Sequence, residues 1–342
     1  MQIKSLTGLT KKYSVGIDIS DTGVKMIALA RQGKQYTVVG FAEGTFGAEA
    51  HCDGKMVDSS ACGNAIVTVW KKIKQTIPKT LVIATASLSD VHTQMALIQI
   101  PASLITEERI REEAGKHIPM HPDTTITSWQ IIDTHEEMAT VFVITVARDT
   151  SDALASALEK AECFPSSIES EAIALARLFG GSEPRVIIDL GATRTLFLLA
   201  HHDVPLFTIS LPLTGHMLTE AIAKTLRLPL AEAEATKIRC GFDDTACQGA
   251  LREIIETHLH ETVQRIGIGL DEITAKEKPL PKDIVLVGGG AHLKKIDSIL
   301  AKELGIPVTQ GNMWSIVQEP SNFPEHPLAW AVALGLALRD LS

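Results

Sequence analysis

Two stretches of the chain repeat one pattern of apolar and polar positions. In residues 13–30 an apolar strand reaches Asp18, a turn of small and hydroxyl residues follows, and a second apolar run leads away. Residues 186–199 repeat this order, with Asp189 near the end of the first strand and a turn of small residues after it. Each copy predicts a β-hairpin with an acid at its base. Because the copies lie about half a chain apart, they predict two lobes built by duplication.

A later strand ends in three consecutive glycines. Residues 283–287 form an apolar run of the buried type, and Gly288, Gly289 and Gly290 follow before a helical stretch. Glycine lets a backbone approach a flat ligand closely, but it costs conformational entropy on folding. We therefore expect these glycines to border a ligand.

The remaining periodicity alternates strands with helices, as is typical of α/β proteins. Apolar runs and alternation predict strands at 35–42, 79–86, 94–101, 126–133, 139–147 and 204–211. Apolar positions at three- and four-residue steps predict helices at 57–76, 106–117, 150–162, 168–179, 218–226, 231–238, 245–275 and 327–341. The last helix is apolar nearly all round, so we expect it to be buried across the base of both lobes.

Composition and charge narrow the class of protein. The chain has 342 residues, of which 45% are hydrophobic and only 4% aromatic, enough for about two domains with aliphatic cores. Its formal net charge of −9 argues against nucleic acid as a partner, because that requires a basic face. The longest apolar run, 328–338, is too short for a bilayer, which needs about 20 residues. We expect no direct membrane insertion and no signal peptide.

The cysteine pattern predicts reduced thiols. Their number is odd and none forms a Cys-x-x-Cys pair, so neither a disulfide framework nor a zinc site is expected. The five residues are Cys52, Cys62, Cys163, Cys240 and Cys247.

The hairpins and the glycine run, in this order and spacing, resemble the two phosphate motifs and the adenosine motif of the actin/Hsp70/sugar-kinase (ASKHA) superfamily. Within it, the chain resembles the PilM family of type IV pilus assembly proteins, relatives of the cell-division protein FtsA, nearly from end to end. The matching stretches are Val15-Gly-Ile-Asp-Ile-Ser20, Val24-Lys25, Asp53-Gly-Lys55, Val57-Asp58, Ile100-Pro101, Ile118-Pro119, Ala172-Ile-Ala-Leu-Ala176, Leu218-Thr-Glu-Ala-Ile222, Ala233-Glu-Ala-x-Lys237 and Ala331-Val-Ala-Leu-Gly-Leu-Ala-Leu338.

The resemblance implies an α/β, actin/Hsp70-like two-lobe fold with duplicated sheet–helix domains and a small α/β insert in the first lobe. Residues 13–86 with 166–183 would form the first lobe (1A-like), and 87–165 the inserted subdomain (1C-like). Residues 184–217 with 281–342 would form the second lobe (2A-like), and 218–280 a helical subdomain (2B-like).

The candidate site is a nucleotide cleft between the lobes. Hairpin tips rich in small and hydroxyl residues can aim N–H groups and hydroxyls at phosphates, and Asp18 and Asp189 would hold Mg²⁺ through water. Acids at strand ends also serve as turn caps, but their matched positions favour the site. The tip residues are Ser20, Asp21, Thr22 and Gly23 on one side and Gly191, Ala192, Thr193 and Thr195 on the other. The resemblance adds Lys25, Gly215, Glu234 and Lys237, of which the last two would otherwise be an ordinary i, i+3 surface pair.

We expect ATP binding with slow or no turnover, and one feature of the sequence counts against binding while another counts against turnover. Asp21 places a carboxylate at a phosphate-binding tip, where it repels the ligand unless it points away or meets Mg²⁺; Arg194 could offset it. No catalytic residue is identified, because none stands out to orient an attacking water.

The resemblance implies a cytoplasmic scaffold, peripheral to the inner membrane through its partner. Its expected partner is a PilN-type bitopic membrane protein, whose short N-terminal tail would lie in a groove between the first lobe and the insert. Pilus motor ATPases and self-association are further expectations. The alternatives are a small-molecule kinase of the superfamily, an FtsA-like filament, and a degenerate cleft used only as an interaction surface.

Overall fold

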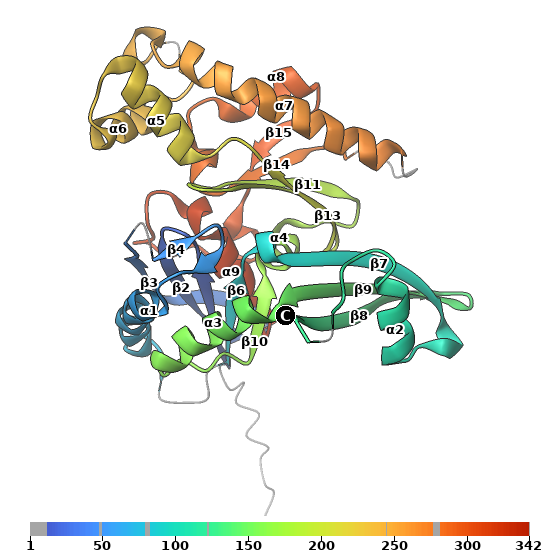
Figure 1. Ribbon diagram of the computed structural model, residues 1–342. Helices are drawn as coiled ribbons and strands as arrows, with labels where there is room; N and C mark the ends of the chain where they lie inside the picture. Colours follow the sequence, from blue (N-terminus) through green and yellow to red (C-terminus); the bar gives the residue numbers. More distant parts are fainter. Residues whose placement is uncertain are drawn as a thin grey trace, which may run out of the picture.

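The computed structural model describes residues 12–47, 50–78, 83–121, 123–243, 245–275 and 281–341. They form two lobes, one above the other in Figure 1, with a smaller unit projecting from the lower lobe. Residues 79–82 of the predicted strand 79–86 lie outside the described residues. Its described part is β6 (Ile83–Leu88).

The first lobe is a six-stranded sheet in the order β10-β6-β1-β2-β3-β16. Its helix α1 (Ser59–Lys74) starts where the Asp58 carboxylate accepts hydrogen bonds from Ser60 N and Ala61 N, the usual role of a helix N-cap. Its buried face packs on the sheet. A short hairpin of β4 (His51–Cys52) and β5 (Lys55–Met56) precedes it. The other strands are β1 (Lys12–Ile19), β2 (Gly23–Gln32), β3 (Gln35–Thr45), β10 (Ser167–Ser170) and β16 (Val317–Gln318).

The second lobe repeats the centre of the first. Strand β11 (Arg185–Leu190) pairs antiparallel with β12 (Thr195–His201) and parallel with β14 (Ile284–Val287), just as β1 pairs with β2 and β6. The expected duplication is therefore confirmed. Its remaining elements are β13 (Val204–Leu211), β15 (Val308–Gln310), α5 (Gly215–Leu226), α6 (Leu230–Cys240), α7 (Arg252–Ala275) and α8 (Ile296–Leu304).

The insert has a sheet in the order β7-β9-β8 and its own core. Helix α2 (Glu107–Ala114) covers one face, where Ile98, Ile110 and Val141 are buried together. Its strands are β7 (Thr93–Pro101), β8 (Thr125–His135) and β9 (Met138–Ala147). Helix α3 (Arg148–Lys160), which the predicted range 87–165 included, packs against α1 in the first-lobe core. The insert is therefore shorter than predicted, at about 93–147.

The C-terminal segment returns to the first lobe, which corrects the predicted second-lobe range 281–342. Strand β16 pairs with β3, and the eight residues of α9 (Ala331–Leu338) are all buried. Helix α9 packs on β1 and on α4 (Glu171–Phe179). The fit is close enough that a Cβ on Gly16 would lie 1.9 Å from the Ala333 carbonyl oxygen. Among the described residues, no helix is both long and apolar enough to cross a membrane.

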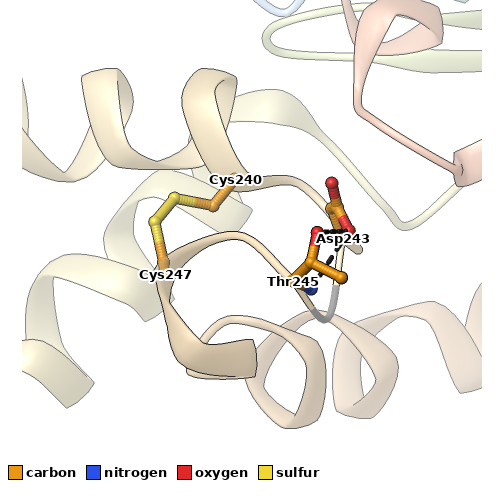
Figure 2. Close-up of a disulfide and its surroundings, with 4 residues drawn as sticks. All are labelled: Cys240, Asp243, Thr245 and Cys247. Atoms are coloured by element: carbon orange, nitrogen blue, oxygen red, sulfur yellow. Dashed lines mark hydrogen bonds between the residues drawn. A yellow bond between two sulfur atoms is a disulfide. The ribbon is translucent and has the colours of Figure 1, made fainter.

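Two other expectations fail at the end of α6. The predicted helix 245–275 begins only at Arg252, because the preceding residues turn back towards α6. This return brings Cys240 and Cys247 to a Cα–Cα distance of 5.9 Å, and a disulfide joins them (Figure 2). Reduced thiols were expected from the odd number of cysteines and the absence of a Cys-x-x-Cys pair, but a tight turn also brings two cysteines seven residues apart to bonding distance. The thiols of Cys52, Cys62 and Cys163 are free.

Candidate functional site

The two hairpin tips face each other across a cavity of about 200 Å³. Most of the predicted phosphate-site and metal-site residues line it. They are Asp18, Ser20, Thr22, Lys25, Asp189, Gly191, Ala192, Thr193, Gly288 and Gly289. The duplicated strands place these residues, since β1 and β11 each end at the cavity.

A larger and more apolar cavity of about 550 Å³ adjoins it and shares Gly191, Ala192 and Gly289. It contains four further predicted positions, Gly215, Glu234, Lys237 and Gly290. The sequence did not indicate the other lining residues, among them Thr219, Leu230, Ile238, His216, His292 and His326. We call the two cavities together the cleft. A polar chamber next to a wider apolar one suits a phosphate chain joined to a base.

Lys237 is not the surface residue that spacing alone suggests. It is 6% exposed, and its ammonium donates to the Gly215 carbonyl at 2.8 Å and to Thr219 Oγ1 at 2.9 Å. The Glu234 carboxylate lies 2.7 Å away. Burial alone would raise the pKa of the Glu234 carboxyl, but the hydrogen bonds from Lys237 and Thr219 hold this pKa below its ordinary value. The pair therefore fixes the start of α5 against α6 inside the cleft.

The carboxylates of the smaller cavity are buried close together. Burial raises the pKa of Asp189 to about 6, and the charge of Asp18 adds to the shift. Burial likewise raises the pKa of Asp18, and that of Glu171 to about 8. A cation would relieve this repulsion, and oxygen donors suit Mg²⁺, which uses one or two carboxylates together with phosphate and water. The donor set of Asp18 and Asp189 therefore fits the ion.

Asp21 points away from the cavity, so its carboxylate does not face a bound phosphate. It is 8% exposed, and one oxygen accepts from Gly54 N at 2.9 Å and lies 2.7 Å from His51 Nδ1. The other accepts from Thr193 Oγ1 at 2.8 Å. Although burial opposes it, the hydrogen bonds from His51 and Gly54 hold the pKa of Asp21 below its ordinary value. Asp21 therefore joins the two tips.

Arg194 has a larger role in the site than the sequence indicated, where it was expected only to offset the charge of Asp21. Its guanidinium donates to Ser89 Oγ and lies 3.3 Å from the Glu171 carboxylate and 3.5 Å from that of Asp21. All three partners belong to the first lobe, so this second-lobe residue bridges the cleft. The contact with Asp21 was indicated by the two hairpin tips, but those with Ser89 and Glu171 have no sequence signal, because these partners lie 105 and 23 positions away in the chain.

Only one glycine of the run has room for a side chain. Gly288 has φ +79°, and a Cβ there would lie 2.2 Å from Asp189 Oδ1, whereas a Cβ on Gly290 would lie 2.8 Å from Leu190 Cβ. A Cβ on Gly289 would meet nothing nearer than 4.0 Å. Packing on the end of β11 therefore accounts for Gly288 and Gly290, while all three glycines border the cleft.

Gly23 and Thr195 do not line the cleft. A Cβ on Gly23 would lie 2.2 Å from the Gly44 carbonyl oxygen, so this glycine lets β2 approach β3. Thr195 is buried, and its hydroxyl donates to the Leu213 carbonyl. Both support the hairpins rather than face a ligand.

A separate groove of about 410 Å³ lies where the insert meets the two lobes. Three edge strands border it: β8 of the insert sheet, β10 of the first-lobe sheet and β13 of the second-lobe sheet. Phe142, Ile144 and Val146 of β9 form an apolar wall. Glu169 and Arg177 also line it and form a partly buried bidentate pair at 2.7 and 2.8 Å, and Arg339 of the lining lies 3.5 Å from the Glu169 carboxylate.

Comparison with known proteins identifies the architecture. Residues 16–341 match the family model described as type IV pilus assembly protein PilM. The chain is similar to the structure of a PilM–PilN type IV pilus biogenesis complex, with a TM-score of 0.79 and 23% identity over 96% of this chain and 98% of that one. It also resembles EutJ from Carboxydothermus hydrogenoformans (TM-score 0.57, 17% identity, 95% and 89% covered) and AMPPNP-bound MreB5 of Spiroplasma citri (0.57, 12%, 96% and 96%). The expected actin-like fold is confirmed.

Proposed function

Because the chain belongs to the family of type IV pilus assembly protein PilM, we propose that it is a nucleotide-binding scaffold of pilus assembly. In this proposal it binds the cytoplasmic N-terminal tail of a PilN-type inner-membrane protein and is held at the membrane by that partner. Hydrolysis of the nucleotide is slow or absent.

The groove between the insert and the lobes is the observation that carries this proposal. An extended peptide has unpaired backbone N–H and C=O groups, and the free edge of a strand can satisfy them. Three such edges border the groove, and its apolar wall can take alternate side chains. Glu169 lies against both Arg177 and Arg339, and the apolar wall of β9 favours a segment with apolar side chains. Similarity to a complex of PilM with PilN supports this assignment.

The cleft supports nucleotide binding. Related folds were solved with ADP and AMPPNP, and the polar chamber fits a phosphate chain with Mg²⁺ held by Asp18 and Asp189. Bound Mg²⁺ would neutralise phosphate charge. Lys25 and the tip N–H groups would bind phosphate oxygens, while Lys237 and Glu234 would order the wall around the base and ribose.

Thermal unfolding with each ligand tests the proposal, because a ligand that binds only the folded state raises the midpoint. We expect the midpoint of the full chain to rise with Mg-ATP, and to rise separately with a synthetic peptide of the partner's N-terminal tail. A scrambled peptide is the control. A rise with Mg-ATP but never with the tail peptide would contradict the scaffold function and favour a small-molecule kinase.

A further inference from the structure

Two short segments line the groove and reach the cleft at the same time. In the first, Leu88 and Thr93 line the groove, whereas Ser89 between them bonds Arg194. In the second, Ser170 and Ile173 line the groove, whereas Glu171 between them lines the cleft. We call residues 88–93 and 168–173 the shared segments. Neighbouring residues of one backbone therefore face two different ligand sites.

Asp90 fastens the two shared segments to each other. Its buried carboxylate accepts from Ser170 Oγ at 2.7 Å and from Ala172 N at 2.8 Å. It also accepts from Thr93 Oγ1 at 3.2 Å within its own segment. A displacement of either segment must therefore move the other or break these bonds.

Arg194 holds both shared segments from the opposite lobe. It donates to Ser89 in one and to Glu171 in the other. It also follows directly after Gly191, Ala192 and Thr193, the second tip of the phosphate chamber. Phosphate oxygens form strong charge-assisted bonds with a guanidinium, so a bound phosphate chain competes with Ser89 and Glu171 for this side chain. The arginine thus has two alternative sets of partners.

We propose that the cleft and the groove are energetically coupled through Arg194 and Asp90. This inference rests on the function proposed above, which supplies the two ligands. A nucleotide draws Arg194 away from the shared segments and loosens the groove wall that they form. Nucleotide and peptide therefore weaken each other's binding, and by linkage the factor is the same in both directions.

The test measures peptide affinity with and without nucleotide. A fluorescently labelled peptide of the partner's N-terminal tail is titrated with the full chain by anisotropy, alone and with saturating Mg-AMPPNP. We expect the dissociation constant to rise about five-fold or more with nucleotide, as is common for coupled sites. In Arg194→Met the constant should be the same under both conditions. Arg265→Met, which changes an exposed arginine of α7, should keep the wild-type response.

The outcomes separate the two proposals. Failure of the peptide to bind the nucleotide-free chain would refute the proposed function. Peptide binding that is unchanged or tightened by Mg-AMPPNP, with occupancy of the cleft confirmed by calorimetry, would overturn the coupling alone. If Arg194→Met does not fold, Ser89→Ala removes only one of its partners, and a smaller nucleotide effect than in the wild type is then required.

Discussion

The two hairpin tips look alike in sequence, but the charged side chains that they place between the two lobes are of opposite sign. The first tip contributes Asp21, whose carboxylate is turned away from the cavity and reaches Thr193 of the other lobe. The second contributes Arg194, whose guanidinium extends to three partners in the first lobe. The duplicated hairpins have therefore become complementary. Repeated hairpins can thus form contacts with each other through different positions of their turns, while the acids at their bases, Asp18 and Asp189, keep matching positions.

Among the substitutions at the contact between the tips, removal of the Asp21 carboxylate should lower folding stability most. Asp21→Ala leaves His51, Thr193 and Arg194 without their buried partner, so we expect unfolding to become easier by about 3 kcal/mol. Urea unfolding measures this. Asp149→Ala is the matched control, because that carboxylate is 73% exposed and its partners are an exposed lysine and the adjacent Thr150; its change should stay within about 0.5 kcal/mol. Equal losses in both variants would contradict the described role of Asp21.

The glycine run packs on the end of β11, next to the second hairpin tip. Substitution of two neighbouring glycines separates the role of this run in folding from its role in ligand binding. Gly288→Ala forces a Cβ against Asp189 at a positive φ, so we expect a loss of about 2 kcal/mol in folding stability. Gly289→Ala should change stability by no more than about 0.5 kcal/mol, because the space is open.

Although Gly289→Ala should keep its folding stability, we expect it to lose nucleotide affinity. A methyl group on Gly289 projects into the cleft, so we expect Mg-ATP to bind this variant about ten-fold more weakly in a calorimetric titration. Wild-type affinity in Gly289→Ala would show that the ligand does not approach this backbone.

The acids in and around the cleft should also respond to pH with opposite signs. The folded-state pKa of Asp21 is lowered, so its stabilisation is present above its ordinary pKa and is lost as pH falls below it. Those of Asp189 and Glu171 are raised to about 6 and about 8. Their stabilising protonated forms are present below the ordinary pKa and are lost as pH rises through these values.

Thermal unfolding without Mg²⁺ tests this sign. Between pH 5 and 8 we expect the wild-type midpoint to fall, and Glu171→Gln to flatten the fall by an amount equivalent to about 1–2 kcal/mol. Glu159→Gln, in the exposed part of α3, is the control. A wild-type midpoint that rises over this range would contradict the assigned burial of the cleft acids.

The sequence predicts those parts of the site that are local. Asp18 and Asp189 are recognisable because each lies near the end of an apolar strand, and the glycine run is recognisable because it directly follows the apolar strand β14. Asp90, Glu171 and His51 were missed because their roles depend on contacts across the fold, and an acid next to a strand or a helix start is common. The ends of the insert were also misplaced, since the apolar stripe of α3 does not reveal which core it joins.

Peptide binding by the groove tests the central claim most directly. Ile168 lies on the edge strand β10, lines the groove and is 37% exposed, so Ile168→Ser removes apolar contact without a core cavity. In a calorimetric titration with the partner's N-terminal peptide, we expect affinity to fall about five-fold, close to 1 kcal/mol. Ile268→Ser on α7, equally apolar and 58% exposed, should bind as the wild type does. Equal affinity in all three proteins, or no binding to the wild type, would contradict the assignment of this groove to the membrane partner.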